Sequence, residues 1–524
     1  MIALTAHQVA EATGGRLCGL DPSQADQPNL VSVTTDSREV TDGTLFVAKP
    51  GQSTDGHLFV PAAAAAGACL SITEREIRDE RGQLYPQVLV QDAVLAMGKL
   101  AHYYLKGLRQ KNRLTLVAVT GSAGKTSTKD LLAAIFEAVG PTVAPLGSYN
   151  GEVGVPLTVF RANEDTRYLV IEMGADGVGH IDYLAKIVEP DHGVILKVGS
   201  AHAGEFGGVD NIEKTKGELA QAVGQTLALN DDDYRVRRML NRTQAATTYF
   251  GLGPHNQDGL DLPRVYADHL RTGSKGCPEF VLVFPEGQSY PIQSQLIGEH
   301  HVYNLLAAAT VAYQVGIDTA VIAEQLNKAK ARSPWRMERT DRADGISVIN
   351  DAYNANPESM AAALRSLAQL GRSSGYRTWA VLGSMLELGD LSVQEHDRLG
   401  RLAVRLNINK LVVVGQEARP IYNAAHLEGS WGEEATWVAD TDQAFDLLSS
   451  ELKAGDLVLF KSSNGAGLGK LGQRVAEADQ LMKPVSTSWL SAGEQAADPA
   501  DCLSDGAADL AAKKIDEREG TPKA

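Results

Sequence analysis

Residues 118–129 read AVTGSAGKTSTK, and this stretch decides the fold of the surrounding chain. The segment LTLVAVT (114–120) is a continuous apolar and β-branched run, which is typical of a strand buried on both faces. TSTKDLLAAIFEAVG (126–140) has the apolar spacing of a helix. A glycine-rich turn between a buried strand and a helix predicts a phosphate-binding loop, because backbone N–H groups and the helix N-terminus both favour an anion.

The residues of this loop have separate predicted roles. Lys125 supplies positive charge for the β- and γ-phosphates, and Thr126 offers a hydroxyl to magnesium. The common phosphate loop has a further glycine where this chain has Val119, so a solvated lysine after a glycine turn is the competing interpretation. We expect nucleotide contacts from the whole loop: Thr120, Gly121, Ser122, Ala123, Gly124, Lys125 and Thr126.

Further strands follow, and polar residues stand at or after their ends. RYLVIEMG (167–174) and HGVILKVG (192–199) repeat the strand signal with helical sequence between them, which predicts a parallel, doubly wound sheet. Glu172 ends the first of these strands, His202 follows the second in SAHAGEFGG, and Lys216 lies in IEKTKGELA. Each alone has an ordinary explanation as a salt-bridged edge residue, a surface histidine or a solvated lysine.

The order TGSAGKTS, EMGA, AHAGEFGG and KGEL resembles the Mur ligase superfamily of ATP-dependent, amide-forming enzymes. The phosphate loop of that superfamily is T-G-x-x-G-K-T/S, so Val119 is no defect. The resemblance runs from about residue 30 to residue 480. It implies an α/β protein of three-domain architecture, with a central P-loop parallel-sheet ATPase domain and a Rossmann-like C-terminal domain.

The resemblance also implies how the polar residues act. ATP phosphorylates a carboxylate to an acyl phosphate, which an amine then attacks. Thr126 and Glu172 match ligands of one Mg²⁺, and His202 matches a ligand of a second. Lys216 matches a lysine that carries CO₂ as a carbamate, so it too serves the metal site. Lys125, Lys216 and His202 are therefore the expected catalytic residues.

Substrate and nucleotide contacts are implied by three further matches. TTDSREVTDGTLFVAKPG (34–51) resembles a UDP-sugar-binding segment, with Ser37 and Arg38 as matching residues. LGSYNGEVGVPLTVF (146–160) resembles a substrate loop headed by Asn150. LIGEHHVYNLLAAA (296–309) resembles a segment that lies against the adenine, with Asn304 as the matching residue and His301 in place of the usual asparagine.

The C-terminal part narrows the resemblance to one branch of the superfamily. DAYNANPESM (351–360) and LGSMLELG (382–389) are similar to the branch that joins D-alanyl-D-alanine to UDP-N-acetylmuramoyl-tripeptide, the last cytoplasmic step towards the pentapeptide precursor of peptidoglycan. Arg336 matches a phosphate contact and Asp351 a ribose contact. Ser384 and Asn464 replace the usual aspartate and arginine, whereas Lys461 is retained.

Three alternatives stay open. The first is a related ligase that adds a single amino acid, or glutamate to folate, which the two C-terminal strings disfavour. A P-loop kinase would phosphorylate its substrate without needing an amine. A nucleotide-binding regulator would bind ATP without turnover.

Bulk properties set the remaining expectations. A chain of 524 residues is too long for one core. A net charge of −16 argues against nucleic-acid binding. Scattered cysteines, the lack of a signal peptide and the lack of a membrane-length apolar run predict a cytoplasmic protein, which we expect to be a monomer. The expected parts are a UDP-substrate domain (1–88), an ATP-binding domain (89–333), a ligase domain (334–483) and a disordered tail (484–524).

Overall fold

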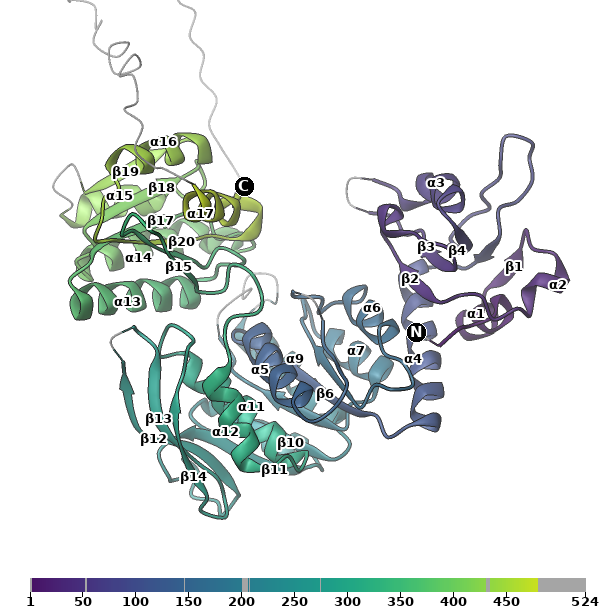
Figure 1. Cartoon of the computed structure of the whole chain (residues 1–524), viewed down its shortest axis with the longest axis horizontal. Helices are drawn as coiled ribbons and strands as arrows, with labels where there is room; N and C mark the ends of the chain where they lie inside the picture. The colour runs from purple at the N-terminus through teal and green to yellow at the C-terminus, as the bar shows by residue number, and fades with distance from the viewer. Residues whose placement is uncertain are drawn as a thin grey trace, which may run out of the picture. The chain divides into compact units, whose positions relative to one another are not determined.

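The computed structural model contains three β-sheets, each associated with helices (Figure 1). It describes residues 2–51, 54–145, 147–199, 206, 208–273, 275–429 and 434–478. His202 and the predicted tail lie outside these ranges. The boundaries drawn after residues 88 and 333 stay predictions. Within the described ranges, no helix combines the length and the apolar character needed to cross a membrane.

The N-terminal sheet has five strands, and only its edge pair β1–β5 is antiparallel. Its order is β1 (Arg16–Cys18), β5 (Gln87–Leu89), β4 (Ala68–Thr73), β3 (Thr44–Val47) and β2 (Ser32–Thr34). The long helix α4 (Ala93–Lys111) packs against α1 (Ala6–Thr13) and against helices of the central region. One continuous apolar core therefore connects this sheet with one face of the central sheet.

The central sheet has nine strands, and β6 lies between β8 and β9. In order, the strands are β14 (Ser289–Gln293), β13 (Pro278–Val283), β12 (Arg264–Thr272), β11 (Ala246–Leu252), β10 (Thr226–Asn230), β9 (His192–Ile195), β6 (Thr115–Thr120), β8 (Tyr168–Glu172) and β7 (Thr142–Val143). Leu116 and Ala118 of β6 face one apolar core, whereas Val117 and Val119 face another. A strand buried on both faces explains the uninterrupted apolar run in the sequence.

Helices cover both faces of the central sheet. One core contains residues of α5 (Lys125–Glu137), α11 (His301–Gln314) and α12 (Thr319–Lys328). The opposite core contains residues of α6 (Gly154–Phe160), α7 (His180–Val188) and α9 (Val209–Ala222). Since β6, β8 and β9 are parallel, their carboxyl ends meet at one edge, where α/β proteins bind ligands.

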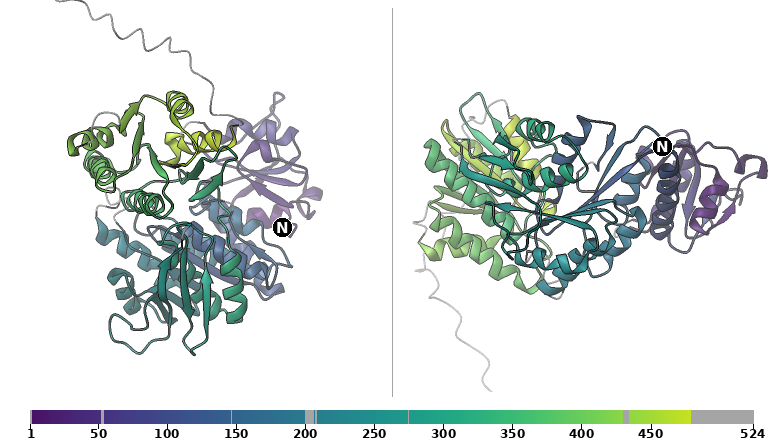
Figure 2. Two further views of the ribbon diagram at one scale, coloured as in Figure 1. Left: turned by 60° about the vertical axis from the view of Figure 1, so that its left-hand side comes forward. Right: turned by 90° about the horizontal axis from the view of Figure 1, so that it is seen from below.

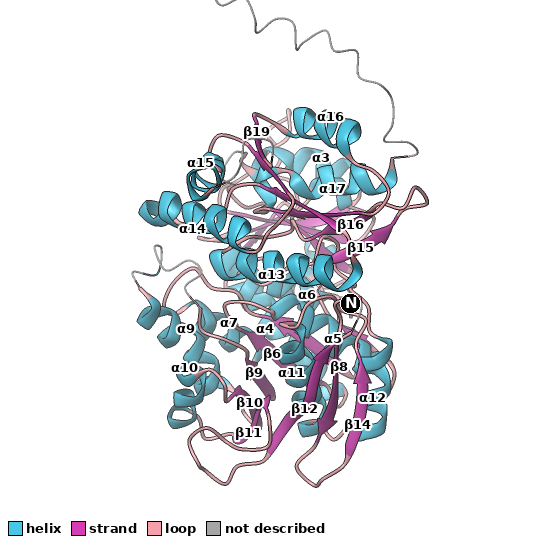
Figure 3. Ribbon diagram, turned by 90° about the vertical axis from the view of Figure 1, so that its left-hand side faces the viewer, coloured by secondary structure: helices cyan, strands magenta, loops and turns pink. Residues whose placement is uncertain are grey.

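The central sheet is mixed: the strands predicted within 114–120, 167–174 and 192–199 form a parallel arrangement, as expected, and an antiparallel extension completes the sheet at one end. β13 is antiparallel to both β12 and β14 (Figure 1), and β14 lies at one end of the sheet (Figure 3). Buried and half-exposed residues alternate in β13, so one face of this extension is partly solvated. That alternation in burial is typical of antiparallel strands, whereas β6 and β8 are buried along nearly their whole length.

The C-terminal sheet has six strands with helices on both faces (Figure 2). Its order is β15 (Glu338–Asp341), β16 (Ser347–Asn350), β20 (Asp456–Lys461), β17 (Arg377–Leu382), β18 (Lys410–Val414) and β19 (Ala435–Val438). One face is covered by α13 (Pro357–Ser374), α14 (Ser392–Arg405) and α15 (Arg419–Glu428), and the other by α16 (Thr441–Glu451) and α17 (Leu468–Glu477). Only the edge strand β15 is antiparallel, as in an open, doubly wound fold.

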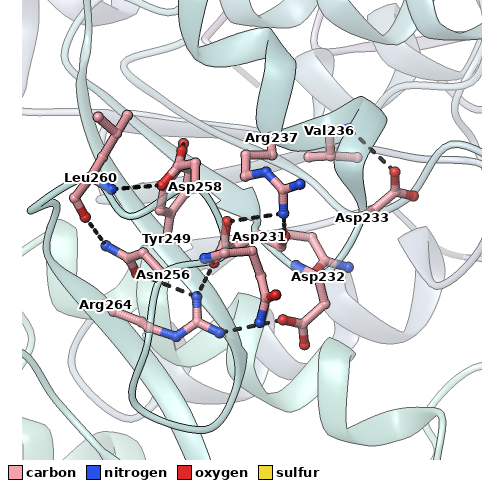
Figure 4. Close-up of polar contacts among 12 residues, drawn as sticks. Asp231, Asp232, Asp233, Val236, Arg237, Tyr249, Asn256, Asp258, Leu260 and Arg264 are labelled. Carbon is pink, nitrogen blue, oxygen red and sulfur yellow. Dashed lines mark hydrogen bonds and ion pairs between the residues drawn. The ribbon is translucent and has the colours of Figure 1, made fainter.

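A buried ion pair fixes the chain after β10 (Figure 4). Arg264 Nη1 lies 2.5 Å from Asp231 Oδ2, and the two side chains are 4% and 0% exposed. The same guanidinium donates to the carbonyl oxygens of Leu252 and Gly253. Its other terminal nitrogen lies 3.3 Å from Asp232 Oδ1. The guanidinium thus ties β12 to the segment that leaves β10.

Arg264→Ala should lower the free energy of unfolding by about 3 kcal/mol, because it leaves the buried Asp231 carboxylate with only the more distant cation of Arg237, at 3.6 Å. Arg271 is the matched control, since it lies on the same strand, pairs with Glu279 at 2.8 Å and is 75% exposed. Arg271→Ala should cost less than about 1 kcal/mol. Urea denaturation of both variants measures the difference, and equal losses would contradict the structural role given to Arg264.

Candidate active site

The phosphate loop has the backbone geometry that its glycines allow. Gly121 and Gly124 have φ angles of 154° and 84°, a region that residues with a Cβ rarely adopt. The helix α5 begins directly afterwards, at Lys125. Lys125 Nζ donates to the Gly121 carbonyl oxygen at 2.8 Å, so the ammonium folds back over the loop. The loop therefore combines a glycine-shaped turn, a helix N-terminus and a cation, as an anion site requires.

The Thr126 hydroxyl lies at the centre of a small polar cluster. Its Oγ1 is 2.9 Å from Ser148 Oγ. Arg336 Nη2 donates to both hydroxyl oxygens, at 3.2 Å and 3.1 Å. The Arg336 guanidinium also stacks on Tyr353, with 4.4 Å between its Cζ and the ring centroid. Its buried Nε has no hydrogen-bond partner within the described ranges, so one donor stays available for an anionic ligand.

Glu172 is placed to accept a cation. Its side chain is buried, and Oε1 accepts a hydrogen bond of 2.8 Å from Asn150 Nδ2. Its Oε2 is buried without a hydrogen-bond partner among the described residues. A buried carboxylate oxygen in this state is costly unless a cation binds it. The described residues contain no cluster of three or more His, Cys, Asp or Glu side chains arranged for a metal. One carboxylate and a hydroxyl still fit Mg²⁺, which keeps several waters and binds substrate phosphates.

Asn304 supports the phosphate loop from α11. Its Oδ1 accepts a long hydrogen bond of 3.5 Å from Thr128 Oγ1, and its Nδ2 lies 3.1 Å from His301 Nδ1. Burial holds the pKa of His301 well below its usual value, so the neutral ring accepts this hydrogen bond from the amide. The histidine that replaces the expected asparagine thus still orients Asn304. The predicted contact of Asn304 with adenine stays a prediction.

Lys216 lines a cavity of about 790 Å³, which is also lined by part of the phosphate loop. Its side chain is buried on α9, and its Nζ lies 6.0 Å from the centroid of the Phe206 ring. Loss of hydration, and then the charge of Lys125, lower the pKa of Lys216 to about 7. Burial likewise lowers the pKa of Lys125. Both amines therefore lose their protons more readily than exposed lysines do.

A second cavity of about 620 Å³ adjoins the first and is lined by phosphate-loop residues, Glu172, Asn304 and Arg336. Asp351, the predicted ribose contact, also lines it. Its Oδ2 lies 2.6 Å from Lys461 Nζ, and its Oδ1 accepts from the Met337 backbone N–H. Asp351 is thus already held on both oxygens.

Two of the predicted substrate-binding residues do not line these cavities. Ser37 and Arg38 line neither cavity, and the Arg38 side chain is 87% exposed beside Asp36. The N-terminal region contributes Thr35 and Lys49 instead. Most of the other predicted residues come together around the phosphate loop: Thr120, Gly121, Ser122, Ala123, Gly124, Lys125, Thr126, Asn150, Glu172, Lys216, Asn304, Arg336 and Asp351.

Three residues of the site were missed by sequence reasoning: Lys49, Ser148 and Tyr353. Tyr353 lies in the quoted D-A-Y-N-A-N-P string, so a signal existed for it. Ser148 lies just before Asn150 in the quoted substrate loop, but nothing in its spacing distinguishes it from a solvated serine.

Comparison with known proteins agrees with this geometry. Three descriptions of sequence families match the chain in order: the Mur ligase catalytic domain over residues 29–104, the Mur ligase middle domain over 119–312, and the Mur ligase glutamate ligase domain over 335–464. The chain belongs to the Mur ligase family. The resemblance seen in the sequence motifs is therefore confirmed.

Relatives in the Mur ligase family are similar over nearly the whole chain. The UDP-N-acetylmuramoyl-tripeptide–D-alanyl-D-alanine ligase of Mycobacterium leprae is 40% identical over 92% of this chain and 100% of its own length. The ligase of the same name from Mycobacterium tuberculosis H37Rv is 41% identical over 91% of this chain and 99% of its own length.

Solved structures of the Mur ligase family share the fold. MurF from Acinetobacter baumannii is 31% identical, has a TM-score of 0.78, and covers 91% of this chain and 99% of its own. MurF ligase from Thermotoga maritima in complex with ADP is 27% identical, has a TM-score of 0.71, and covers 86% of this chain and 98% of its own. These matches confirm the predicted three-domain α/β architecture.

The Lys216 amine should titrate near pH 7, because burial and the nearby Lys125 charge disfavour its protonated form. In a sample freed of CO₂, the ¹³Cε resonance of labelled Lys216 should show a midpoint near pH 7, with the neutral amine predominant above it. Lys125→Met should raise that midpoint, since it removes one of the two causes. A midpoint near that of an exposed lysine would contradict the burial of Lys216.

Proposed function

We propose that this protein is the ATP-dependent ligase that joins D-alanyl-D-alanine to UDP-N-acetylmuramoyl-tripeptide, with release of ADP and phosphate. The observation that supports the proposal is that two adjoining cavities meet at the phosphate loop and at the segment 148–150. Both are lined by Ser122, Lys125, Ser148 and Asn150. A nucleotide in one cavity and a carboxylate substrate in the other would meet at Lys125. The relatives of the same name support the choice of substrates.

The proposed reaction has two steps. A carboxylate oxygen of the tripeptide attacks the γ-phosphorus of ATP, and ADP leaves. The amine of D-alanyl-D-alanine then attacks the acyl carbon, phosphate leaves, and the amine loses a proton. In the first step, Lys125 and Arg336 offset the charge that gathers on the transferring phosphoryl group. The neutral form of Lys216 is available at physiological pH for reaction with CO₂.

We include Mg²⁺ in the proposal because Glu172 Oε2 is buried without a hydrogen-bond partner among the described residues. Thr126 and Glu172 would hold the ion, and the predicted second site would add His202 and carbamylated Lys216. When bound, the ion neutralises phosphate charge. Asn150 orients the Glu172 carboxylate through its hydrogen bond, which leaves Oε2 directed away from that contact.

Two further points complete the proposal. ATP as the phosphoryl donor favours a cytoplasmic location. The expectation that the protein is a monomer stays part of the proposal.

Sustained ADP release, beyond a single turnover, should require all three substrates: ATP, UDP-N-acetylmuramoyl-tripeptide and D-alanyl-D-alanine. A coupled assay that omits one substrate at a time tests this requirement. Lys125→Ala should lower turnover by about 10²–10³-fold, because a charge next to the transferring phosphoryl group is lost. Sustained ADP release without the dipeptide would favour a kinase, and preference for a single amino acid would favour another branch of the family.

Lys216→Ala should lower activity by about 10–100-fold, because it removes the predicted carbamate oxygens from the metal site. Acetate or propionate should restore part of the activity by filling the gap with a carboxylate. Lys216→Arg should be as impaired as Lys216→Ala, since a guanidinium does not provide an oxygen ligand. Lys214, exposed on the same helix, gives the control, and Lys214→Ala should behave as the wild type.

A readout independent of turnover completes this test. Wild-type protein equilibrated with ¹³C-bicarbonate should show a carbamate resonance that Lys216→Ala lacks and Lys214→Ala keeps. Full activity of Lys216→Arg, or no labelled carbamate, would overturn the assignment.

A further inference from the structure

Arg336 lies between two residues with an unfavourable backbone conformation. Trp335 and Met337 have φ angles of 58° and 51°. A residue with a Cβ rarely adopts this left-handed region, because the Cβ approaches a carbonyl oxygen. Two such residues on either side of one arginine require contacts that hold them there.

Backbone hydrogen bonds supply part of this hold. The Trp335 N–H donates to Glu338 Oε2 at 3.0 Å, and the Trp335 carbonyl oxygen accepts from the Tyr353 N–H at 3.2 Å. The Met337 N–H donates to Asp351 Oδ1 at 3.1 Å. The segment is therefore bonded at three backbone positions to β15 and to the chain after β16.

The Trp335 ring supplies the remaining contact, against the first turn of α17. A Cβ built on Gly469 would lie 2.5 Å from the nearest ring atom and 2.8 Å or less from two more. The Gly469 carbonyl oxygen accepts a hydrogen bond from Asn350 Nδ2 at 2.8 Å, so this turn is itself anchored to β16. Only glycine at position 469 lets the ring approach so closely without movement.

This packing bears on the contacts that Arg336 makes at the phosphate loop. With its two neighbours held, the Arg336 side chain stacks on Tyr353 and donates to Thr126 and Ser148. We propose that Trp335 and Gly469 are positioning residues: the contact of the ring with the glycine locks the strained segment that directs Arg336 at the phosphate loop. This inference rests on the proposed function, since it concerns the same nucleotide site.

Gly469→Ala tests the contact in the full-length protein. The methyl group must displace the Trp335 ring, so kcat/KM for ATP should fall by about 10–100-fold, as small misplacements of reacting groups do. Gly107 is the matched control, because it lies within helix α4 and a Cβ there would meet no atom within 4 Å. Gly107→Ala should keep activity within about twofold of the wild type.

A double-mutant cycle with Arg336→Ala separates positioning from general damage. If Gly469 acts through Arg336, adding Gly469→Ala to Arg336→Ala should change kcat/KM by less than about twofold. An equal loss in both backgrounds, or no loss from Gly469→Ala alone, would overturn the inference. A merely destabilised protein would show the loss in both backgrounds.

The same cycle read as the dissociation constant of ATP, by calorimetry, does not depend on turnover. If the wild type binds ATP but shows no dipeptide-dependent ADP release, the proposed function fails while the binding cycle still decides the positioning role. Should Gly469→Ala fail to fold in a thermal melt, Trp335→Ala replaces it, because that side chain is only half-buried. Trp335→Ala should show the same loss and the same non-additivity with Arg336→Ala, and additive losses would again overturn the inference.

Discussion

The contact between Gly124 and Asn304 is the constraint on which the rest of the site depends. A Cβ at position 124 would lie 2.2 Å from Asn304 Oδ1, so the loop and α11 approach as closely as glycine permits. This approach fixes where α5 begins, and therefore where Lys125 and Thr126 lie. Strand β6, which is buried on both faces, ends directly before the loop and so fixes its starting point. The close packing of the backbone thus determines where the side chains of the anion site lie.

Much of this arrangement could be predicted from the sequence because burial leaves a direct signal. β6, β8 and β9 fall within the apolar runs at 114–120, 167–174 and 192–199. Parallel strands buried on both faces need such runs, and their carboxyl ends must meet at one edge. Once the strands were placed, Glu172 at the end of β8 had to lie near the phosphate loop.

Other features left a weaker signal, for physical reasons. Burial alternates along β13 because one face of the antiparallel extension is partly solvated, yet its sequence PEFVLV is mostly apolar, so the sequence alone does not show that this strand is antiparallel. Lys216 looked like a solvated lysine in a charged helix. Its spacing from Ile212 and Leu219 nevertheless places it on the buried face of α9, a pattern that a helical projection shows. Ser37 and Arg38 line neither cavity, and their contact with the substrate stays a prediction.

The two buried lysines of the site share one electrostatic problem. Lys125 and Lys216 both lose hydration, and the charge of Lys125 disfavours protonation of Lys216. Two ammonium groups that repel each other in a poorly hydrated cavity are costly unless anions arrive. A phosphate next to Lys125 would offset that cost and favour its protonated form, whereas CO₂ on Lys216 would convert a repelled cation into an anion. Burial disfavours the positive charge of each lysine on its own. The cavity therefore favours ligands that supply negative charge.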